Sequence, residues 1–280
     1  TPAPNTTHNI LRAALATEGR AITLYEEVHQ QSKLANKQVH KKFLSTLKEL
    51  LPKNCLPIIV TDGGYHNEWF RDVLNCGWDY VGRIRVGSGK KFYDDNHAQW
   101  HSCSKISNKA VSTPKYVGKV YLCKSNPLHT NLHVYKGKHK GRKSLNRHGN
   151  KRRSTGEHDY RKTSREPWII ATSLTGASYL VSKKVMKIYS KRMQIEEGIR
   201  DLKSTRYGFS FNNAHSYKIK RIEILLLISM LASFIAWLVG KIGEKQKLHY
   251  QFQSNSEKTR RVLSFFNLGC KMIKKKIKIT

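Results

Sequence analysis

Apolar and polar positions follow two kinds of spacing in the first third of the chain. Residues 10–17 and 20–28 are two short runs joined by Glu18-Gly19, and Ala21–Tyr25 alternates small or polar with apolar side chains, which is the pattern of a β-hairpin with Gly19 at the turn. Residues 37–51 repeat apolar side chains at helical intervals and stop at Pro52. Three more elements are predicted: a strand over 56–60, a helix over 68–74 and a strand over 80–86.

The strand over 56–60 differs from the hairpin because its apolar run is continuous, which is typical of a strand buried on both faces. Thr-Asp-Gly-Gly follows the run and places Asp62 at its carboxyl end. Sites in open α/β sheets gather at the carboxyl ends of strands. The order of elements therefore indicates an α/β fold on a mixed sheet, with Asp62 as a candidate site residue.

The rest of the chain predicts strands over 116–123, 133–135 and 168–173, and long helices over 182–204 and 218–246. Within the last helix, Ile224–Val239 has 16 residues without a charge. A membrane-spanning helix needs about 20, and this run contains Ser229 and Ser233. We expect a buried core helix, while a membrane-associated protein that uses this run with its basic flanks is kept as an alternative.

The charge balance points to a polyanionic partner. The chain has 52 Lys+Arg against 19 Asp+Glu, a formal net charge of +33, and nucleic acid is the partner that such an excess favours. Hydrophobic residues make up 39% of the chain, which is enough for a core and excludes a disordered basic tail. The five cysteines form no C-x-x-C pair, which argues against a disulfide framework or zinc knuckle and favours a cytoplasmic protein.

The region 87–175 is rich in Gly, Ser, Asn, Lys and His. Within it, Lys136–Arg165 holds twelve Lys and Arg against two acids, Glu157 and Asp159. Such a strip is either a solvated loop or a surface that neutralises phosphates, and we favour phosphate contact. Of the thirteen histidines, only His97-x3-His101 has a spacing that suggests a zinc site, and its surroundings lack a helical apolar pattern.

One face of the helix predicted over 182–204 holds an acid, two bases and a phenol: Tyr189, Arg192, Glu196 and Lys203. At 100° per residue they fall within about 60° of arc. An apolar stripe lies beside them on the helical wheel: Ile188, Ile195, Ile199 and Leu202. Charges at the edge of a buried stripe suggest a cleft, whereas an ordinary Arg192–Glu196 pair explains the spacing equally well, and periodicity leaves both open.

These four residues read Tyr-x2-Arg-x3-Glu-x6-Lys, which resembles the signature of bacterial cut-and-paste DNA transposases of the insertion-sequence-four family. Three other segments resemble this family in the same order: 22–27 (ITLYEE), 57–65 (PIIVTDGGY) and 166–172 (EPWIIAT). The resemblance covers nearly the whole chain and is strongest to the Tn10-type transposases. It implies a DDE transposase with a ribonuclease-H-like mixed sheet flanked by helices and a β-rich insertion between the second and third acidic residues.

The resemblance also implies roles for single residues. Asp62 matches the second acid and Glu196 the third, and such carboxylates hold two divalent ions, Mg²⁺ or Mn²⁺. We expect their carboxyl groups about 5–8 Å apart, close enough to share both ions. Arg192 and Lys203 match the bases that contact the DNA backbone, and Tyr189 is expected to bond a phosphate there.

Trp168 matches a tryptophan of the insertion that stacks on an extruded base during hairpin formation at the transposon end. Stacking of a base on an aromatic ring is worth about 1–3 kcal/mol. The alternative is a plain core residue, because Ile169 and Ile170 follow it. We favour the stacking role and keep the core alternative.

The chain departs from the family pattern at the first acid, since no Asp precedes Asp62. By the alignment that acid falls just before Thr1, so we expect a truncated chain that is inactive alone. The expected division is 1–86 for the first part of the catalytic core, 87–175 for the insertion, 176–215 for the signature helix and 216–280 for a carboxyl-terminal helical segment.

The resemblance implies DNA, both transposon ends and target, as the partner, and a homodimer for full-length members. No membrane partner is expected, and the location is the bacterial cytoplasm, in association with the nucleoid. The competing hypothesis is a basic nucleic-acid-binding protein without catalysis, in which Asp62 and Glu196 are structural. Metal binding separates the two, because only a catalytic core should bind Mn²⁺.

Overall fold

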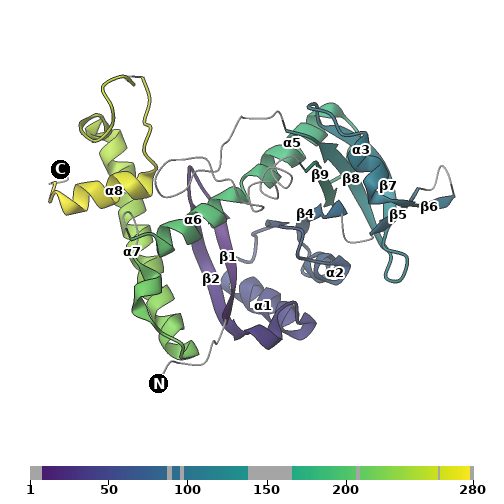
Figure 1. Ribbon diagram of the computed structural model, residues 1–280, viewed down its shortest axis with the longest axis horizontal. Helices are drawn as coiled ribbons and strands as arrows, with labels where there is room; N and C mark the ends of the chain where they lie inside the picture. The colour runs from purple at the N-terminus through teal and green to yellow at the C-terminus, as the bar shows by residue number, and fades with distance from the viewer. Residues whose placement is uncertain are drawn as a thin grey trace, which may run out of the picture. The chain divides into compact units, whose positions relative to one another are not determined.

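The computed structural model describes residues 8–86, 90–94, 98–137, 166–205, 209–257 and 259–277 (Figure 1). The chain divides into two compact units. One unit, here the sheet unit, is His40–Ser190, and the other, the hairpin unit, is Thr1–Val39 with Lys191–Thr280. Each unit is described by itself.

The sheet unit is built on seven strands in the order β3-β4-β9-β8-β7-β5-β6. Only β3 and β4 are parallel, so the sheet is mixed but mostly antiparallel. Five of the seven strands, β5 to β9, come from the expected insertion and extend the same sheet. The strands are β3 (Ile58–Thr61), β4 (Asp79–Ile84), β5 (Lys91–Asp94), β6 (Gln99–Ser102), β7 (Lys115–Leu122), β8 (Leu128–Tyr135) and β9 (Trp168–Thr172).

Helices cover both faces of this sheet, as consecutive residues of β4 show. Val81 packs in a core cluster with Val185 and Met186 of α5 (Tyr179–Ser190). The preceding residue, Tyr80, points to the opposite face and stacks on Phe70 of α2 (Asn67–Asn75) at 4.5 Å between ring centroids. Two other helices belong to this part of the chain: α1 (Lys37–Leu50) and α3 (Cys103–Asn108).

The hairpin unit contains β1 (His8–Ala16) and β2 (Ala21–Gln30), which pair with each other as a separate two-stranded sheet. Gly19 has φ of +87° in the turn, a conformation that favours glycine, so the predicted hairpin and its turn are confirmed. The helices of this unit are α6 (Met193–Lys203), α7 (Ile219–Lys245) and α8 (Phe265–Lys274). The described residues of this unit also form short 3₁₀ turns: η1 (Gln31–Lys33), η3 (Phe211–Ala214) and η4 (Leu248–Gln251).

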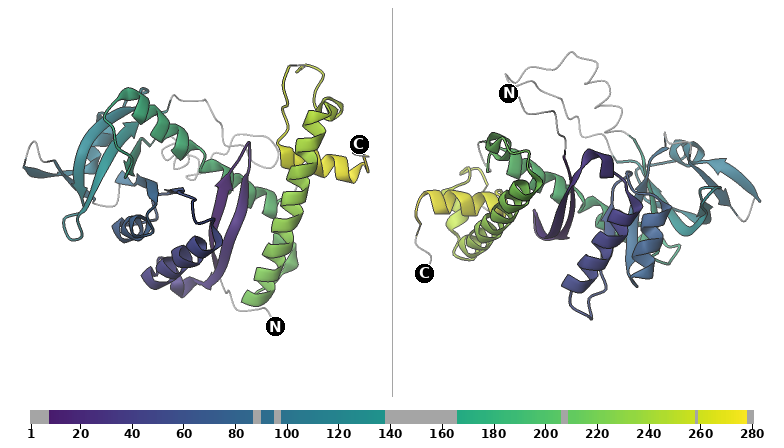
Figure 2. Two further views of the ribbon diagram at one scale, coloured as in Figure 1. Left: turned by 180° about the vertical axis from the view of Figure 1, so that it is seen from behind. Right: turned by 90° about the horizontal axis from the view of Figure 1, so that it is seen from below.

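Glycines let α7 and α8 cross closely, and both views of Figure 2 show the yellow α8 running across α7. A Cβ on Gly240 would lie 1.9 Å from the carbonyl oxygen of Phe265. A Cβ on Gly269 would lie 1.7 Å from the carbonyl oxygen of Ala236. Neither backbone can yield by that much, so both positions require glycine.

The prediction of one helix over 182–204 is wrong, because α5 ends at Ser190 and α6 begins at Met193. Between them the backbone bonds tighten to the three-residue spacing, with Gln194 N–H donating to the Lys191 carbonyl at 3.0 Å. The buried sides also differ: α5 buries Tyr189 and Val185, whereas α6 buries Leu202. On one continuous helix those residues would lie on different faces, so the single apolar stripe read from the wheel does not exist.

The prediction of a buried helix at Ile224–Val239 is right about the helix and wrong about its burial. Only 17% of the most apolar 18-residue window of α7 is buried. Ile222 and Leu226 pack with Val28 of β2, so one side of the helix is covered. The other side is exposed, with Ile224 and Ile228 each 57% accessible. By length and composition α7 qualifies as a membrane-span candidate, the one such helix in the described part of the chain.

Several elements were not expected, namely β5, β6, α3 and α8. The basic strip beyond Gly137 and His97 of the suggested zinc spacing lie outside the described residues. The four-part division of the chain stays a prediction.

Candidate active site

Asp62 stands directly after β3, at the end of a strand that pairs in parallel with β4. Its Oδ1 accepts the backbone N–H of Gly64 at 2.9 Å, and this bond shapes the turn that leaves the strand. Asp62 itself is half-buried. The structure therefore places this carboxylate at the carboxyl end of a sheet strand, which was the position predicted from the sequence.

Charged and aromatic side chains surround the Asp62 turn. A Cβ on Gly63 would meet Cγ of Arg85 at 2.4 Å, so the side chain of Arg85 lies across the turn at a point that glycine keeps open. Burial raises the pKa of Tyr65 to about 12, and the negative charge of Asp62 adds to the rise. Burial lowers the pKa of His66, with the positive charge of Lys90 adding to the effect. The turn thus combines a carboxylate with nearby cations.

In the hairpin unit, three signature residues share one face of α6. Arg192 precedes the first helical residue, and at 100° per residue Glu196 and Lys203 fall within about 40° of it. The Glu196 side chain is 48% exposed and Lys203 is exposed. Arg192 Nη1 donates to Glu196 Oε1 at 2.5 Å, an ion pair between residues four apart. This face exposes the carboxylate of Glu196 and the cation of Lys203, while the Arg192 side chain is 15% exposed and engaged with Glu196.

Glu197, the neighbouring acid, is engaged differently. Arg20, in the turn between β1 and β2, donates to Glu197 through Nη1. Through Nε the same arginine donates to Asp201 Oδ2 at 2.6 Å. Gln194 Oε1 accepts the N–H of Thr17 at 3.0 Å, and its Nε2 donates to the Thr17 carbonyl at 2.7 Å. These bonds fasten α6 to the hairpin turn, so Glu197 pairs with the hairpin, whereas the partner of Glu196 is Arg192 beside α6 itself.

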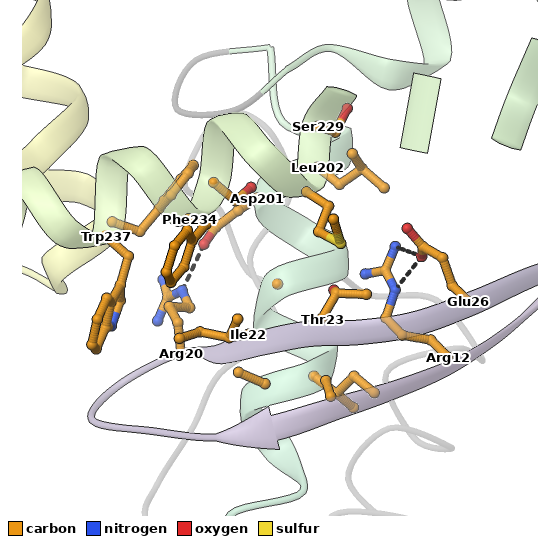
Figure 3. A pocket seen from close by; sticks show the side chains of 17 residues that line it. Arg12, Arg20, Ile22, Thr23, Glu26, Asp201, Leu202, Ser229, Phe234 and Trp237 are labelled. Carbon is orange, nitrogen blue, oxygen red and sulfur yellow. Dashed lines mark hydrogen bonds and ion pairs between the residues drawn. The ribbon is translucent and has the colours of Figure 1, made fainter. Parts of the chain in front are cut away.

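A pocket lies among the hairpin, α6 and α7 (Figure 3). Two ion pairs stand in its wall: Arg12 with Glu26 at 2.6 Å, and Arg20 with Asp201. Phe234 of α7 adds an aromatic wall. Both pairs are intramolecular and part-buried, so the pocket belongs to the packing that holds α6.

Trp168 and Tyr189 meet inside the sheet unit. Their ring centroids are 4.8 Å apart at 73°, and the centroid of the Tyr135 ring lies 5.8 Å from that of Trp168. Tyr189 is 2% exposed, whereas Trp168 is half-buried at the start of β9. These contacts agree with the core alternative for Trp168, and base stacking by Trp168 and phosphate bonding by Tyr189 stay predictions.

The predicted site residues are divided between the two units. Asp62, Trp168 and Tyr189 belong to the sheet unit, and Arg192, Glu196 and Lys203 to the hairpin unit. The convergence of Asp62 with Glu196 therefore stays a prediction. Among the described residues no group of three His, Cys, Asp or Glu side chains is placed to hold a metal ion.

Sequence reasoning missed Arg85, Arg20 and Gln194. Arg85 follows β4 and could have been found because Gly63 marks a close approach. The pairing of Arg20 with residues 177 and 181 positions away had no local signal.

The profile of the transposase DDE domain matches residues 5–235, well over half of the chain. No curated protein sequence matches the chain. The matched range contains the Asp62 turn and all of α6. The chain therefore belongs to the DDE transposase family, whose members act on DNA in the cytoplasm during transposition and generally use divalent metal ions.

Proposed function

We propose that the chain is the catalytic core of a cut-and-paste transposase of the insertion-sequence-four type, which cleaves and joins DNA strands at transposon ends. The observation that carries the proposal is the outward face of α6, where Glu196 lies between Arg192 and Lys203. Glu197 is fastened to Arg20 of the hairpin turn, whereas Glu196 pairs with Arg192, a cation that can itself turn to a phosphate, so we assign the chemistry to Glu196. The family match to residues 5–235 supports the reaction class.

Asp62 and Glu196 fit a divalent metal by their chemistry. Both are carboxylates, the hard oxygen donors that Mg²⁺ and Mn²⁺ prefer, and neither is fully buried. Bound metal ions supply Lewis-acid activation of the attacking and leaving oxygens in phosphoryl transfer.

The cations of α6 position the DNA. Arg192 and Lys203 present charge-assisted donors to phosphate oxygens on the side of the helix that carries Glu196. Arg192 pairs with Glu196 without DNA, so binding a phosphate requires Arg192 to exchange one anion for another. That exchange would release Glu196 when the substrate arrives.

DNA is the proposed partner, at transposon ends and target sites, with a homodimer as the working form of full-length relatives. The 280-residue chain has no Asp before Asp62, so we propose that it binds DNA and does not cut it alone. Two carboxylates instead of three would hold the divalent ions, and small misplacements of the reacting groups cost orders of magnitude in rate.

Strand cleavage of a labelled transposon end with Mg²⁺ or Mn²⁺ tests the proposal. The chain is compared with a version extended at its amino end by an Asp-Trp strand, and with the extended version carrying Glu196→Gln or Glu197→Gln. Cleavage is expected only after extension, with Glu196→Gln lowering it at least about 100-fold and Glu197→Gln far less. If the extended chain with Glu196→Gln still cleaves DNA, the assignment of Glu196 as a catalytic acid is wrong. If the unextended chain cleaves DNA, the proposal that it is inactive alone is wrong.

The alternative, a basic DNA-binding protein without catalysis, is favoured by one contact. The Arg192–Glu196 pair at 2.5 Å is what a purely structural role predicts. Calorimetric titration with Mn²⁺ separates the two proposals: the catalytic core binds the ion and loses binding in Asp62→Asn, whereas the simple binder shows no heat in either form.

A further inference from the structure

A row of four aromatic rings crosses the outer strands of the sheet unit. The strand register pairs Trp100 of β6 with Tyr93 of β5, Tyr93 with Tyr121 of β7, and Tyr121 with His129 of β8. Residues that pair across adjacent strands project to the same face of a sheet. The four rings, here the aromatic row, therefore stand side by side on one face of β6, β5, β7 and β8, whose ribbons lie together in Figure 1.

Burial shows that this face is open along part of the row. Leu122 follows Tyr121 and Leu128 precedes His129, so both point to the other face. Both are buried, with 2% and 5% of their surface exposed. Tyr121 is 38% exposed and His129 is also exposed. Strands that bury one face and expose the other normally place polar side chains outward, so exposed rings call for a partner or a packing role.

Neighbouring rings contact each other in pairs. The ring of Tyr121 stacks on His129 with centroids 4.6 Å apart and planes inclined by 17°. Tyr93 and Trp100 are 5.5 Å apart at 52°. These pairs hold the rings in fixed orientations, so little rotational freedom is lost when a flat ligand stacks on them.

Cations flank the row. Lys91 and Lys119 stand two positions before Tyr93 and Tyr121 on the same strands, so they lie on the same face, and both are exposed. A surface that combines exposed rings with adjacent lysines matches a ligand that carries flat apolar rings on an anionic backbone. Single-stranded nucleic acid has both, because each unpaired base exposes a ring face and each linkage carries a phosphate.

We infer that the aromatic row binds single-stranded DNA by base stacking. A duplex keeps its base faces stacked inside the helix, so it could use the lysines and not the rings. The inference uses neither Asp62 nor Glu196. It rests on the family's action on DNA and adds to the proposed function a surface for unpaired bases. The competing explanation is that the rings only stabilise strand pairing.

Binding of two fluorescently labelled DNA molecules to the full chain tests the inference: a 20-nucleotide thymidine oligomer and a 20-base-pair duplex. Tyr121→Val removes the ring and keeps a residue that favours strands, and Tyr121→Phe keeps the ring. We expect Tyr121→Val to weaken oligomer binding at least fivefold and duplex binding less than twofold. Tyr121→Phe should bind both as the parent chain does. Tyr217→Val, which removes a 52% exposed ring elsewhere, is the matched control and should change neither.

Two other variants sharpen the result. Lys119→Ala should weaken both DNA forms and reduce the slope of log affinity against log salt by about 0.7–0.9, the effect of one phosphate contact. Trp100→Phe keeps a ring, so its affinity for the oligomer should equal that of the parent chain. In the parent chain the bound oligomer should quench the fluorescence of Trp100, and this quenching should be lost in Trp100→Phe. This readout serves even if Tyr121→Val fails to fold.

Equal losses for oligomer and duplex in Tyr121→Val, or no loss for either, would overturn the inference, as would unchanged quenching in Trp100→Phe. Tenfold tighter binding of the matching RNA would overturn the choice of DNA. Glu196→Gln separates this surface from the proposed catalysis: it should lower cleavage by the extended chain at least about 100-fold, and any change in affinity should be equal for oligomer and duplex, because Glu196 lies outside the aromatic row.

Discussion

The sheet unit and the hairpin unit each carry one candidate acid, but they hold it by different forces. Asp62 follows a strand in a sheet that is covered on both faces, with Phe70 and Tyr80 buried on one side and Val81 and Met186 on the other. Glu196 lies on a helix fastened by the polar contacts of Arg20 and Gln194. Salt screens ion pairs and does not weaken hydrophobic packing in this way. The position of Glu196 should therefore respond to ionic strength more than that of Asp62.

The largest expected effect is a loss of stability of the sheet unit in acid. His133 is fully buried in β8, its Nδ1 lies 3.0 Å from Ser182 Oγ, and Nε2 has no hydrogen-bond partner among the described residues. Burial lowers the pKa of His133 to about 4 from 6.5. Below pH 6.5 His133 is protonated in the unfolded chain and stays neutral in the folded one. The free energy of unfolding therefore falls as pH drops toward 4, by roughly 3 kcal/mol in all.

Urea unfolding at several pH values between 7 and 4 measures this loss. His133→Gln should flatten the pH dependence, and His129→Gln on the exposed face of the same strand should not. The same slope in both variants would show that the acid sensitivity lies elsewhere.

The next effect concerns the crossing of α7 and α8. Gly240→Ala places a methyl group against the backbone of Phe265 and should destabilise the hairpin unit by about 1–3 kcal/mol. Gly198→Ala in α6 is the matched control, because nothing lies within 4 Å of its added methyl group. Since alanine favours helices, that control should leave the unit as stable or stabilise it slightly. Thermal melts followed by circular dichroism compare the two variants, and equal melting temperatures would contradict the close crossing.

The smallest effect tests the attachment of α6. Arg20→Ala removes the partner of both Glu197 and Asp201 and should cost about 1 kcal/mol at low salt, less at 1 M salt. Arg200→Ala is the control because that arginine is 68% exposed and its ion pair with Glu197 is long, at 3.6 Å. Almost no change in stability is expected. Hydrogen exchange of the α6 amides reports the loosening directly. A loss that does not depend on salt would mean that packing, not charge, holds the helix.

Local patterns were enough to predict several elements and failed where distant contacts decide. The hairpin with Gly19, the helix ending near Pro52 and the strand before Asp62 were confirmed because turn residues and periodicity act over a few positions. Residues 182–204 were predicted as one helix, but they form two. Tyr189 packs on the sheet, whereas Leu202 packs with Val28 of β2. Spacing alone does not show which neighbour each face meets.

The same limit applies to the candidate site. The position of Asp62 followed from one strand and its turn, and the family signature identified Glu196. The engagement of Glu197 by Arg20 depends on a partner far away in the sequence, which explains why only the structure distinguishes the two glutamates by contact.

The exposed side of α7 has a practical consequence for handling the protein. Its outward residues alternate steps of four and three along the helix: Ile224, Ile228, Leu231, Ile235, Leu238 and Ile242. A net charge of +33 keeps two such chains apart at low ionic strength. Concentrated salt, which strips bound nucleic acid during purification, shortens the Debye length to about 3 Å and removes that repulsion. The step that frees the protein from DNA is therefore the step at which it should become least soluble.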